Sequence, residues 1–319
     1  MRVAVIIPCY NEEITVANVV ADARKYLPES QIFVFDNNSK DDTAANAKAA
    51  GAHVIHSRRQ GKGHVVRHAL RTVVADIYLI IDGDDTYSLA HGPALVDAVA
   101  NGGYEMAVGT RLQNFGENSF RPLHLMGNKM FSMLVRVLFG QRITDIFSGY
   151  RAVSRHLVRR IPLRSEGFEI ETEFTLQTFA SGLPWIEIPT PYGERPEGSH
   201  SKLRTWGDGF LILKFIAHLV RHYKPLMFFS TFGFAFFLAG ALAGWAPIMD
   251  YIDHKFVYHV PLAILAASLM VMSAVFFGVG LILDAQIRYM HTQLDVFTSL
   301  LRDETPELVR PGNHLGRAS

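Results

Sequence analysis

Three aspartates stand within four residues of one another in the segment IDGDDTY, residues 81–87. Asp82, Asp84 and Asp85 directly follow VVADIYLI, an apolar run rich in β-branched residues that predicts a buried strand of a parallel sheet. Ligands of open α/β sheets bind beyond the carboxyl ends of the strands. Clustered carboxylates there are costly to keep ionised unless a cation neutralises them, and their oxygens suit Mg²⁺ or Mn²⁺. Taken alone, the segment fits a metal site at this cluster of three carboxylates or an ordinary acidic turn.

Short apolar runs alternate with helical patterns on both sides of this segment, which predicts a doubly wound, mostly parallel sheet. Strands are expected at residues 3–7, 32–35, 53–56, 73–80 and 106–108, the first ending at Pro8, and helices from residue 15 and at 44–50 and 64–74. Neither a GxGxxG fingerprint nor a Walker P-loop follows any of these strands. The phosphates of a nucleotide would therefore have to be held by a metal ion and by side chains.

Composition narrows the class of protein. The 319 residues exceed one typical domain, and a net charge of +1 gives no sign of nucleic-acid binding. The single cysteine, Cys9, permits no internal disulfide, and we interpret it as a packed small hydrophobe rather than a nucleophile. The N-terminal residues are not expected to act as a signal peptide, because the apolar run is short and acidic residues follow it.

Two apolar runs in the last third of the chain predict a transmembrane hairpin. Residues 226–249 and 260–283 contain no Asp, Glu, Lys or Arg. Each run would form a helix of about 36 Å, against a hydrocarbon core of about 30 Å. A buried hairpin of a soluble protein is the alternative. The loop between them, residues 250–259, holds only Lys255, whereas Lys and Arg are frequent before the hairpin, so we expect the loop on the outer side and both flanks in the cytoplasm.

The motifs of the first half share their order and spacing with a known family. VIIPCYNEE, VFDNNSKDDT, GKG, IDGDDTY and VGTR resemble the nucleotide-sugar half of a family-two glycosyltransferase with the GT-A fold. The resemblance implies that Asp82 and Asp84 bind the metal ion and the donor diphosphate. It also implies a wider set of residues around the nucleotide diphosphate sugar, namely Pro8, Tyr10, Glu12, Asp36 and Gly83. Lys62 of GKG is a further phosphate-binding candidate, although a lysine in a flexible loop is nearly as good an interpretation.

The second half resembles one branch of that family. TDIFSGYRAVSR (residues 144–155), GFEIETE (167–173) and PTPYGERPEGSHSKLR (189–204), with two apolar runs after them, are similar to polyprenyl-phosphate glycosyltransferases, which include dolichol-phosphate mannose synthases. The resemblance implies that Arg195, Ser201 and Lys202 close over the donor diphosphate. The residues expected to bind the phosphate of the acceptor lipid are Arg111, Asn128, Ser148 and Arg151.

The chemistry of such a reaction explains the expected catalytic residues, Asp84, Arg111 and Asp145. A phosphate monoester is largely dianionic at pH 7 and needs no general base. Two unit charges about 4 Å apart repel by roughly 4 kcal/mol at an effective dielectric near 20, so cations must bring the acceptor to the donor. Asp145 would be the base if the acceptor were a hydroxyl, would orient Arg111 or the sugar if it is a phosphate, or would cap a turn. Glu171 and Glu173 point to different faces of a helix, and Glu171 is the one expected to face the site.

The expected architecture is a cytoplasmic GT-A domain (1–204), an interfacial amphipathic helix (205–225, or a core-facing helix), a transmembrane hairpin (226–283) and a cytoplasmic C-terminal helix and tail (284–319). The expected activity is inverting, metal-dependent transfer of a hexose from a UDP- or GDP-sugar to undecaprenyl or dolichyl phosphate, with homo-oligomerisation through the glycine-containing spans as an option. The alternatives are a processive polysaccharide synthase, which should carry a QxxRW motif that is absent here, a transferase with a hydroxyl acceptor, and a non-catalytic scaffold or flippase accessory.

Overall fold

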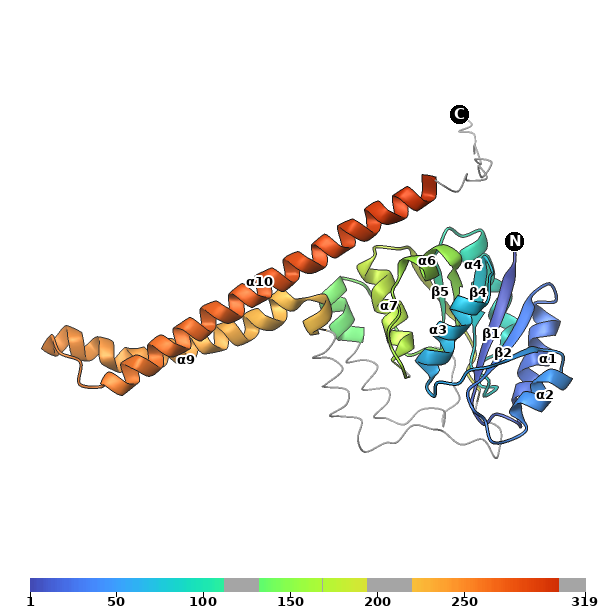
Figure 1. Cartoon of the computed structure of the whole chain (residues 1–319), viewed down its shortest axis with the longest axis horizontal. Helices are drawn as coiled ribbons and strands as arrows, with labels where there is room; N and C mark the ends of the chain where they lie inside the picture. The colour runs from blue at the N-terminus through green and yellow to red at the C-terminus, as the bar shows by residue number, and fades with distance from the viewer. Residues whose placement is uncertain (112–131, 168, 194–219, 304–319) are drawn as a thin grey trace. The chain divides into compact units, whose positions relative to one another are not determined.

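The computed structural model describes residues 1–111, 132–167, 169–193 and 220–303 (Figure 1). These residues belong to two compact units, one within residues 1–216 and the other within residues 217–319. The first unit is an α/β domain and the second is a pair of long helices. The expected interfacial helix at 205–225 lies almost entirely outside the described residues and stays a prediction.

A seven-stranded sheet forms the centre of the first unit, in the order β3-β2-β1-β4-β6-β5-β7. Its strands are β1 (Val3–Cys9), β2 (Gln31–Asp36), β3 (His53–His56), β4 (Ile77–Ile80), β5 (Met106–Thr110), β6 (Arg151–Ser154) and β7 (Trp185–Pro189). Only β6 among them runs antiparallel to its neighbours, β4 and β5. The predicted mostly parallel α/β sheet is confirmed, although the sequence analysis assigned no strand to residues 151–154 or 185–189.

Two strand boundaries differ from the prediction for a physical reason. β1 does not end before Pro8 but pairs with β2 as far as Cys9 and Asp36. Proline is tolerated there because the ladder between β1 and β4 has already ended at Ile6 and Ile80, so no neighbour needs the missing N–H. β4 is shorter than the predicted run, because the chain from 73 to 76 only approaches the sheet; the N–H of Asp76 donates to the carbonyl of Arg2 at 2.8 Å.

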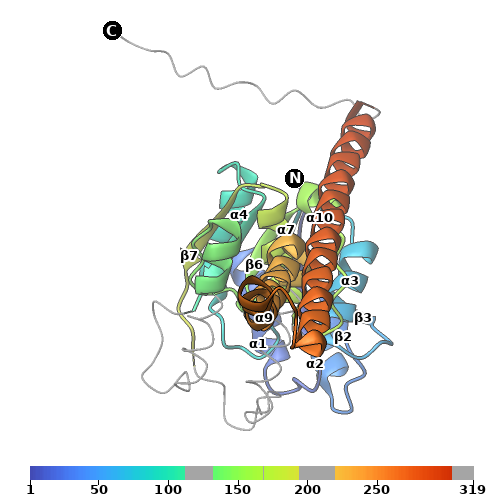
Figure 2. The ribbon, with the colours of Figure 1, turned by 90° about the vertical axis from the view of Figure 1, so that its left-hand side faces the viewer.

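Helices cover both faces of the sheet and bury two apolar clusters (Figures 1 and 2). One cluster includes side chains of α1 (Val16–Tyr26), α2 (Thr43–Ala49) and α4 (Gly92–Ala100), the last preceded by a short 3-10 turn, η1 (Leu89–His91). The other includes side chains of α3 (Lys62–Thr72), α6 (Arg155–Arg160) and α7 (Ile170–Ala180). Residues 132–139 are also helical. The two clusters make the sheet buried on both sides, which is why its central strands read as continuous apolar runs.

The second unit consists of α9 (Pro225–His254) and α10 (Val260–Asp303), which pack along each other. Segments Pro225–His254 and Val260–Met290 are long and apolar enough to cross a membrane, with mean hydropathies of 1.9 and 2.4. The helix expected from residue 284 is present as far as Asp303, but it is the continuation of α10 and not a separate element. The physical reason is the absence of Gly and Pro between residues 281 and 303, so nothing ends the helix where its apolar character declines. The cytoplasmic location expected for this part of α10 stays a prediction.

Candidate functional site

Three strand ends gather the acidic and basic side chains at one edge of the sheet. β4 and β5 end at this edge, and the antiparallel strand β6 begins there. Residues just after β4 and β5 therefore meet residues just before β6. The closeness is visible at Gly149, where an added Cβ would lie 2.5 Å from Oδ2 of Asp82. It is also visible at Arg111, whose Nε lies 2.7 Å from Oδ2 of Asp145.

Asp82 is held by a lysine from α3. The Nζ atom of Lys62 lies 2.5 Å from Oδ1 of Asp82 and 2.5 Å from Oε1 of Glu171. Burial alone would lower the pKa of Lys62, but the two adjacent carboxylates outweigh it and raise the pKa, so the lysine is charged. The G-K-G lysine is therefore a fixed cation beside Asp82 in this structure rather than a freely moving loop side chain. Of the two glutamates, Glu171 points toward Asp82, whereas Glu173 accepts hydrogen bonds from the backbone N–H groups of Arg164 and Ser165.

The turn carrying Asp84 is fixed by its neighbours. Asp84 is 5% exposed and its Oδ1 accepts a hydrogen bond from the hydroxyl of Thr86 at 2.6 Å. The carbonyl of Gly83 accepts from the hydroxyl of Thr15 at 2.7 Å. A Cβ at Gly83 would lie 2.5 Å from Sγ of Cys9, so this position has no room for a side chain. Cys9 is 2% exposed in the apolar core, as its interpretation as a packed hydrophobe requires.

The donor set at this turn fits one particular kind of metal site. Among the described residues, no group of three or more His, Cys, Asp or Glu side chains gathers to hold a metal ion. Asp82 and Asp84 thus offer two carboxylates and no all-protein cage. That combination suits Mg²⁺ or a similar hard cation, which is usually held by one or two carboxylates and completed by phosphate oxygens and water.

The loops after β1 and β2 form the neighbouring part of the edge, where the predicted base- and ribose-binding residues lie. Cys9 at the end of β1 is paired with Asp36 at the end of β2. Pro8 in β1, and Tyr10 and Glu12 in the loop after it, therefore lie at the same end of the sheet as Asp36. Asp36 is 5% exposed, and its carboxylate accepts from the N–H of Ser39 at 3.2 Å and contacts Nδ1 of His56 at 3.2 Å. The N–H of Glu12 donates to the hydroxyl of Thr43 at 2.8 Å, which ties the two loops together.

Asn37 was missed by the sequence analysis although it organises this region. Its side-chain amide donates to the carbonyls of Ser57 and Arg59, at 3.0 and 2.7 Å, and its Oδ1 accepts from the N–H of Gly61 at 2.8 Å. One buried side chain thus links the end of β2 to the loop that carries Lys62. An asparagine at a strand end is ordinary turn chemistry, so no local signal distinguishes this role.

Arg111 and Asp145 form a forked ion pair on the other side of the edge. The Nε and Nη2 atoms of Arg111 donate to the two carboxylate oxygens of Asp145 at 2.7 and 2.8 Å, and the backbone N–H of Arg111 adds a third bond at 3.1 Å. The Asp145 side chain is 0% exposed and that of Arg111 is 17% exposed. The guanidinium also lies 5.5 Å from the ring centre of Tyr192. Asp145 therefore orients Arg111, which is one of the roles weighed from the sequence.

Glu187 supports this pair from β7. Its Oε1 accepts hydrogen bonds from the backbone N–H groups of Thr144 and Asp145, at 2.9 and 3.1 Å. Burial raises the pKa of Glu187, and these hydrogen bonds oppose the shift. The sequence analysis did not single out Glu187, because only the pairing of β7 with β5 brings it to the segment before β6.

Ser148 and Arg151 occupy positions that do not fit direct contact with an acceptor. Arg151 is 1% exposed and donates to the carbonyls of Glu171 and Ser148, at 2.9 and 2.6 Å. Ser148 is 0% exposed and its hydroxyl donates to the carbonyl of Gly109. Because β6 alternates its side chains between the two faces of the sheet, Arg151 turns inward toward α7. We therefore correct the expectation: both residues brace the start of β6. Four other predicted site residues, Asn128, Arg195, Ser201 and Lys202, lie outside the described residues.

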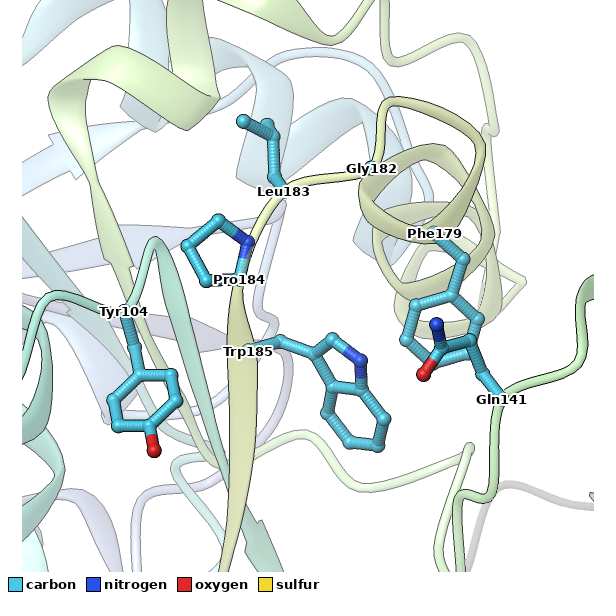
Figure 3. Close-up of a pocket in the computed structure, with 7 residues that line it drawn as sticks. All are labelled: Tyr104, Gln141, Phe179, Gly182, Leu183, Pro184 and Trp185. Carbon is cyan, nitrogen blue, oxygen red and sulfur yellow. The ribbon is translucent and has the colours of Figure 1, made fainter.

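A cavity of about 300 Å³ lies at the opposite end of the sheet (Figure 3). Its lining comes from the segments before β5, β6 and β7, from the end of α7 and from the first residue of β7. These residues are Tyr104, Gln141, Phe179, Gly182, Leu183, Pro184 and Trp185. β5 and β7 begin near this cavity and end near Arg111, so the cavity is separate from the carboxylate cluster.

Comparison with known proteins relates the chain to sugar transferases. Residues 4–161 match the family model Glycosyl transferase family 2. The chain is 34% identical over 236 residues to glycosyltransferase AglJ of Haloferax volcanii, with 73% of this chain and 77% of the relative covered. It is 31% identical over 213 residues to a dolichyl-phosphate hexose transferase of the same organism, covering 67% of this chain and 91% of the relative. An undecaprenyl-phosphate mannosyltransferase of Micrococcus luteus is 29% identical over 214 residues, covering 62% of this chain and 86% of the relative.

Solved structures show the same fold. The glucosyl-3-phosphoglycerate synthase of Mycobacterium tuberculosis, in complex with Mn²⁺, UDP and phosphoglyceric acid, superposes with a TM-score of 0.54 at 22% identity, covering 69% of this chain and 77% of that chain. The sequence relatives define a sugar-transferring enzyme, and the solved structures show that its architecture is of the GT-A type. The chain belongs to glycosyltransferase family 2. The predicted fold class, the resemblance to this family and the expectation of an enzyme are confirmed.

Proposed function

We propose that this glycosyltransferase transfers a hexose from a nucleotide diphosphate sugar to a polyprenyl phosphate at the cytoplasmic membrane face. The observation that carries the proposal is the arrangement of charges at one sheet edge. The carboxylates of Asp82 and Asp84 follow β4, while the guanidinium of Arg111, fixed by Asp145, follows β5. An anionic donor held through a cation and an anionic acceptor held through an arginine can thereby meet between them. Relatives named as dolichyl- and undecaprenyl-phosphate sugar transferases support the acceptor class.

The donor side of the site is assigned to the loops after β1, β2 and β4. Pro8, Tyr10, Glu12 and Asp36 would hold the base and ribose, and Asp82, Gly83 and Asp84 the diphosphate end. Asp82 and Asp84 would hold a Mg²⁺ or Mn²⁺ ion, which would stabilise the charge that grows on the leaving diphosphate. Lys62, already charged and fixed beside Asp82, would add to the positive potential there. Arg195, Ser201 and Lys202 stay proposed diphosphate-binding residues from the family resemblance.

The acceptor side is assigned to Arg111, with Asn128 as a second proposed contact. Two of the N–H groups of Arg111 are committed to Asp145, which leaves the orientation of the guanidinium plane determined before any ligand arrives. A fixed cation of this kind reduces the repulsion between the acceptor phosphate and the donor diphosphate. It also aligns the phosphate oxygen for attack from the face opposite the leaving group, which would give the inverting outcome.

The geometry of Asp145 favours a phosphate acceptor over a hydroxyl. A general base must face the proton that it removes, at a distance of about 2.6–3.2 Å. Both carboxylate oxygens of Asp145 accept hydrogen bonds from Arg111, and the side chain is 0% exposed. A phosphate acceptor needs no base, so this engaged carboxylate can serve entirely as the support of Arg111.

The second unit would anchor the enzyme in the membrane where its acceptor lies. Two helices long enough to cross a bilayer, with the loop at residues 255–259 between them, suit a hairpin whose loop faces outward. The scarcity of Lys and Arg at 250–259 relative to the flanking segments supports that orientation, with the catalytic unit in the cytoplasm.

A transfer assay on the detergent-purified chain tests the proposal. Undecaprenyl phosphate would be incubated with a panel of UDP- and GDP-sugars, each with Mn²⁺ or with EDTA. The expected result is one donor that gives a glycolipid only when metal is present. A product that forms on a hydroxyl-bearing lipid, and not on the lipid phosphate, would overturn the acceptor class.

A further inference from the structure

Three charged side chains form a buried bridge that the proposed function does not yet use in full. Lys62 stands between Asp82 and Glu171, with 2.5 Å to a carboxylate oxygen of each. The side chain of Glu171 is 7% exposed and that of Lys62 is 12% exposed, whereas that of Asp82 is 25% exposed. The bridge is thus closed at Glu171 and accessible at Asp82, the end that faces the proposed metal ion.

The loop around Lys62 is shaped to receive the segment that leads to Glu171. A Cβ at Gly61 would lie 2.3 Å from the carbonyl oxygen of Glu166, and one at Gly63 would lie 2.3 Å from that of Ser165. Gly61 also has a φ of 126°, which L side chains rarely adopt. The N–H of His64 donates to the carbonyl of Glu166 at 3.3 Å. Both glycines of G-K-G are therefore needed because the backbone at 165–166 packs directly against them.

Glu171 is itself held in place from behind. Its backbone carbonyl accepts a hydrogen bond from Nη1 of Arg151 at 2.9 Å. On the open side, a Cβ at Gly149 would lie 2.5 Å from Oδ2 of Asp82 and 3.0 Å from Nζ of Lys62. The close packing on both sides fixes the ammonium group between its two carboxylates.

The single positive charge of Lys62 is shared by the carboxylates of Asp82 and Glu171. The negative charge of Asp82 is therefore only partly neutralised, and Asp82 can bind a second cation. A metal ion that binds Asp82 must compete with Lys62 for Oδ1. A buried ammonium that loses its partner carries a large free-energy penalty. Glu171 reduces that penalty, because it keeps a carboxylate against Lys62 when Asp82 turns to the metal.

We propose that Glu171 is a positioning residue that acts through Lys62 to set the affinity of Asp82 for a divalent cation. The proposal rests on the proposed function, which places that cation at Asp82 and Asp84. It goes further by assigning control of the cation to a residue on α7 that lies behind the lysine.

Mn²⁺ binding without turnover tests this inference. The full chain in detergent would be titrated with Mn²⁺ and the free ion followed by electron paramagnetic resonance, at saturating UDP or GDP, whichever the wild type binds more tightly. Glu171→Gln keeps the shape and an acceptor oxygen but removes the charge, and should weaken Mn²⁺ binding by about fivefold. Lys62→Met removes the competing cation and should tighten it. The double variant should bind Mn²⁺ as Lys62→Met does, because Glu171 then has nothing to act through.

The outcomes separate failure of the inference from failure of the proposed function. If Glu171→Gln weakens Mn²⁺ binding by the same factor with and without Lys62, the inference is wrong and Glu171 acts on the metal directly. Unchanged Mn²⁺ affinity in Glu171→Gln, with only a lower unfolding midpoint, also overturns it and leaves a structural role. If the wild type binds no Mn²⁺ with either nucleotide, or if Asp84→Asn binds it equally well, the proposed metal site fails instead. Glu105→Gln, which alters a partly buried carboxylate paired with His156, serves as the control for general loss of stability.

Discussion

Replacement of Asp145 distinguishes an orienting carboxylate from a catalytic base. In the structure, Asp145 is 0% exposed and accepts three hydrogen bonds from Arg111, at 3.1, 2.7 and 2.8 Å. Asp145→Ala would leave the guanidinium, which is only 17% exposed, without its carboxylate. Breaking a buried ion pair from one side costs about 3–5 kcal/mol, and the partial exposure of Arg111 places the expected loss near the lower end, about 3 kcal/mol.

The stability effect can be measured as a shift of the thermal unfolding midpoint. For a domain of this size, 1 kcal/mol corresponds to about 2–4 °C, so Asp145→Ala should lower the midpoint by roughly 6–12 °C. Asp97→Asn, a change at an exposed carboxylate on α4, is the control and should shift it by no more than about 2 °C. Replacing both Asp145 and Arg111 by apolar residues should lower the midpoint by less than the sum of the two single changes. The double variant leaves no unpaired buried charge, whereas each single variant leaves one.

The activity of Asp145→Asn completes the test. The amide keeps one acceptor oxygen for Arg111, so transfer to polyprenyl phosphate should fall by about 10²-fold or less, with a raised KM for the acceptor. A drop of about 10⁴-fold in kcat with an unchanged unfolding midpoint would refute the reasoning. That combination would mean that Asp145 performs a chemical step instead of orienting Arg111.

Three further predictions concern other parts of the chain. Asp84→Asn should lower turnover by about 10²-fold or more, the scale of losing one electrostatic stabiliser; near-normal transfer in the metal-containing assay would remove the metal assignment. Gly63→Ala should lower both the unfolding midpoint and transfer activity, because its Cβ would lie 2.3 Å from the carbonyl oxygen of Ser165; an unchanged midpoint in a thermal scan would contradict the close packing at that loop. A reporter that works only in the cytoplasm should be active when it is fused after Ser319. A reporter that works only outside the membrane should be active when it is inserted at 256–258. Reversed signals would overturn the proposed topology.

Much of the fold was predictable because its central elements are encoded locally. Four of the five predicted strands, β1, β2, β3 and β5, lie within three residues of the predicted boundaries. In β1 and β5, and over most of β2, the β-branched apolar residues are buried as expected for strands of a sheet covered on both faces, whereas the edge strand β3 is only partly buried. The two long apolar helices were equally clear, since helix length and hydropathy depend on consecutive residues alone.

The short elements of the second half were not predictable in the same way. β6 has four residues and runs antiparallel between two strands that are otherwise parallel to each other. No local pattern in the segment RAVS predicts an antiparallel strand between β4 and β5. It nevertheless decides the site, because it brings Asp145 and Gly149 to the edge where β4 and β5 end. Arg151 shows the same limit: an arginine in a motif suggests a ligand contact, yet the register of β6 turns it into the interior against α7.

The sequence by itself determined the family, the mostly parallel α/β class of the sheet, the acidic turn at Asp82 and Asp84, and the two apolar helices. Each of these depends on neighbouring residues or on motifs in a fixed order along the chain. Only the tertiary structure decided that Arg111 is forked to Asp145, that Lys62 bridges Asp82 and Glu171, and that Asn37 ties β2 to the loop of Lys62. These contacts join residues 20 to 109 positions apart, and their partners are chosen by strand order and packing rather than by spacing in the sequence.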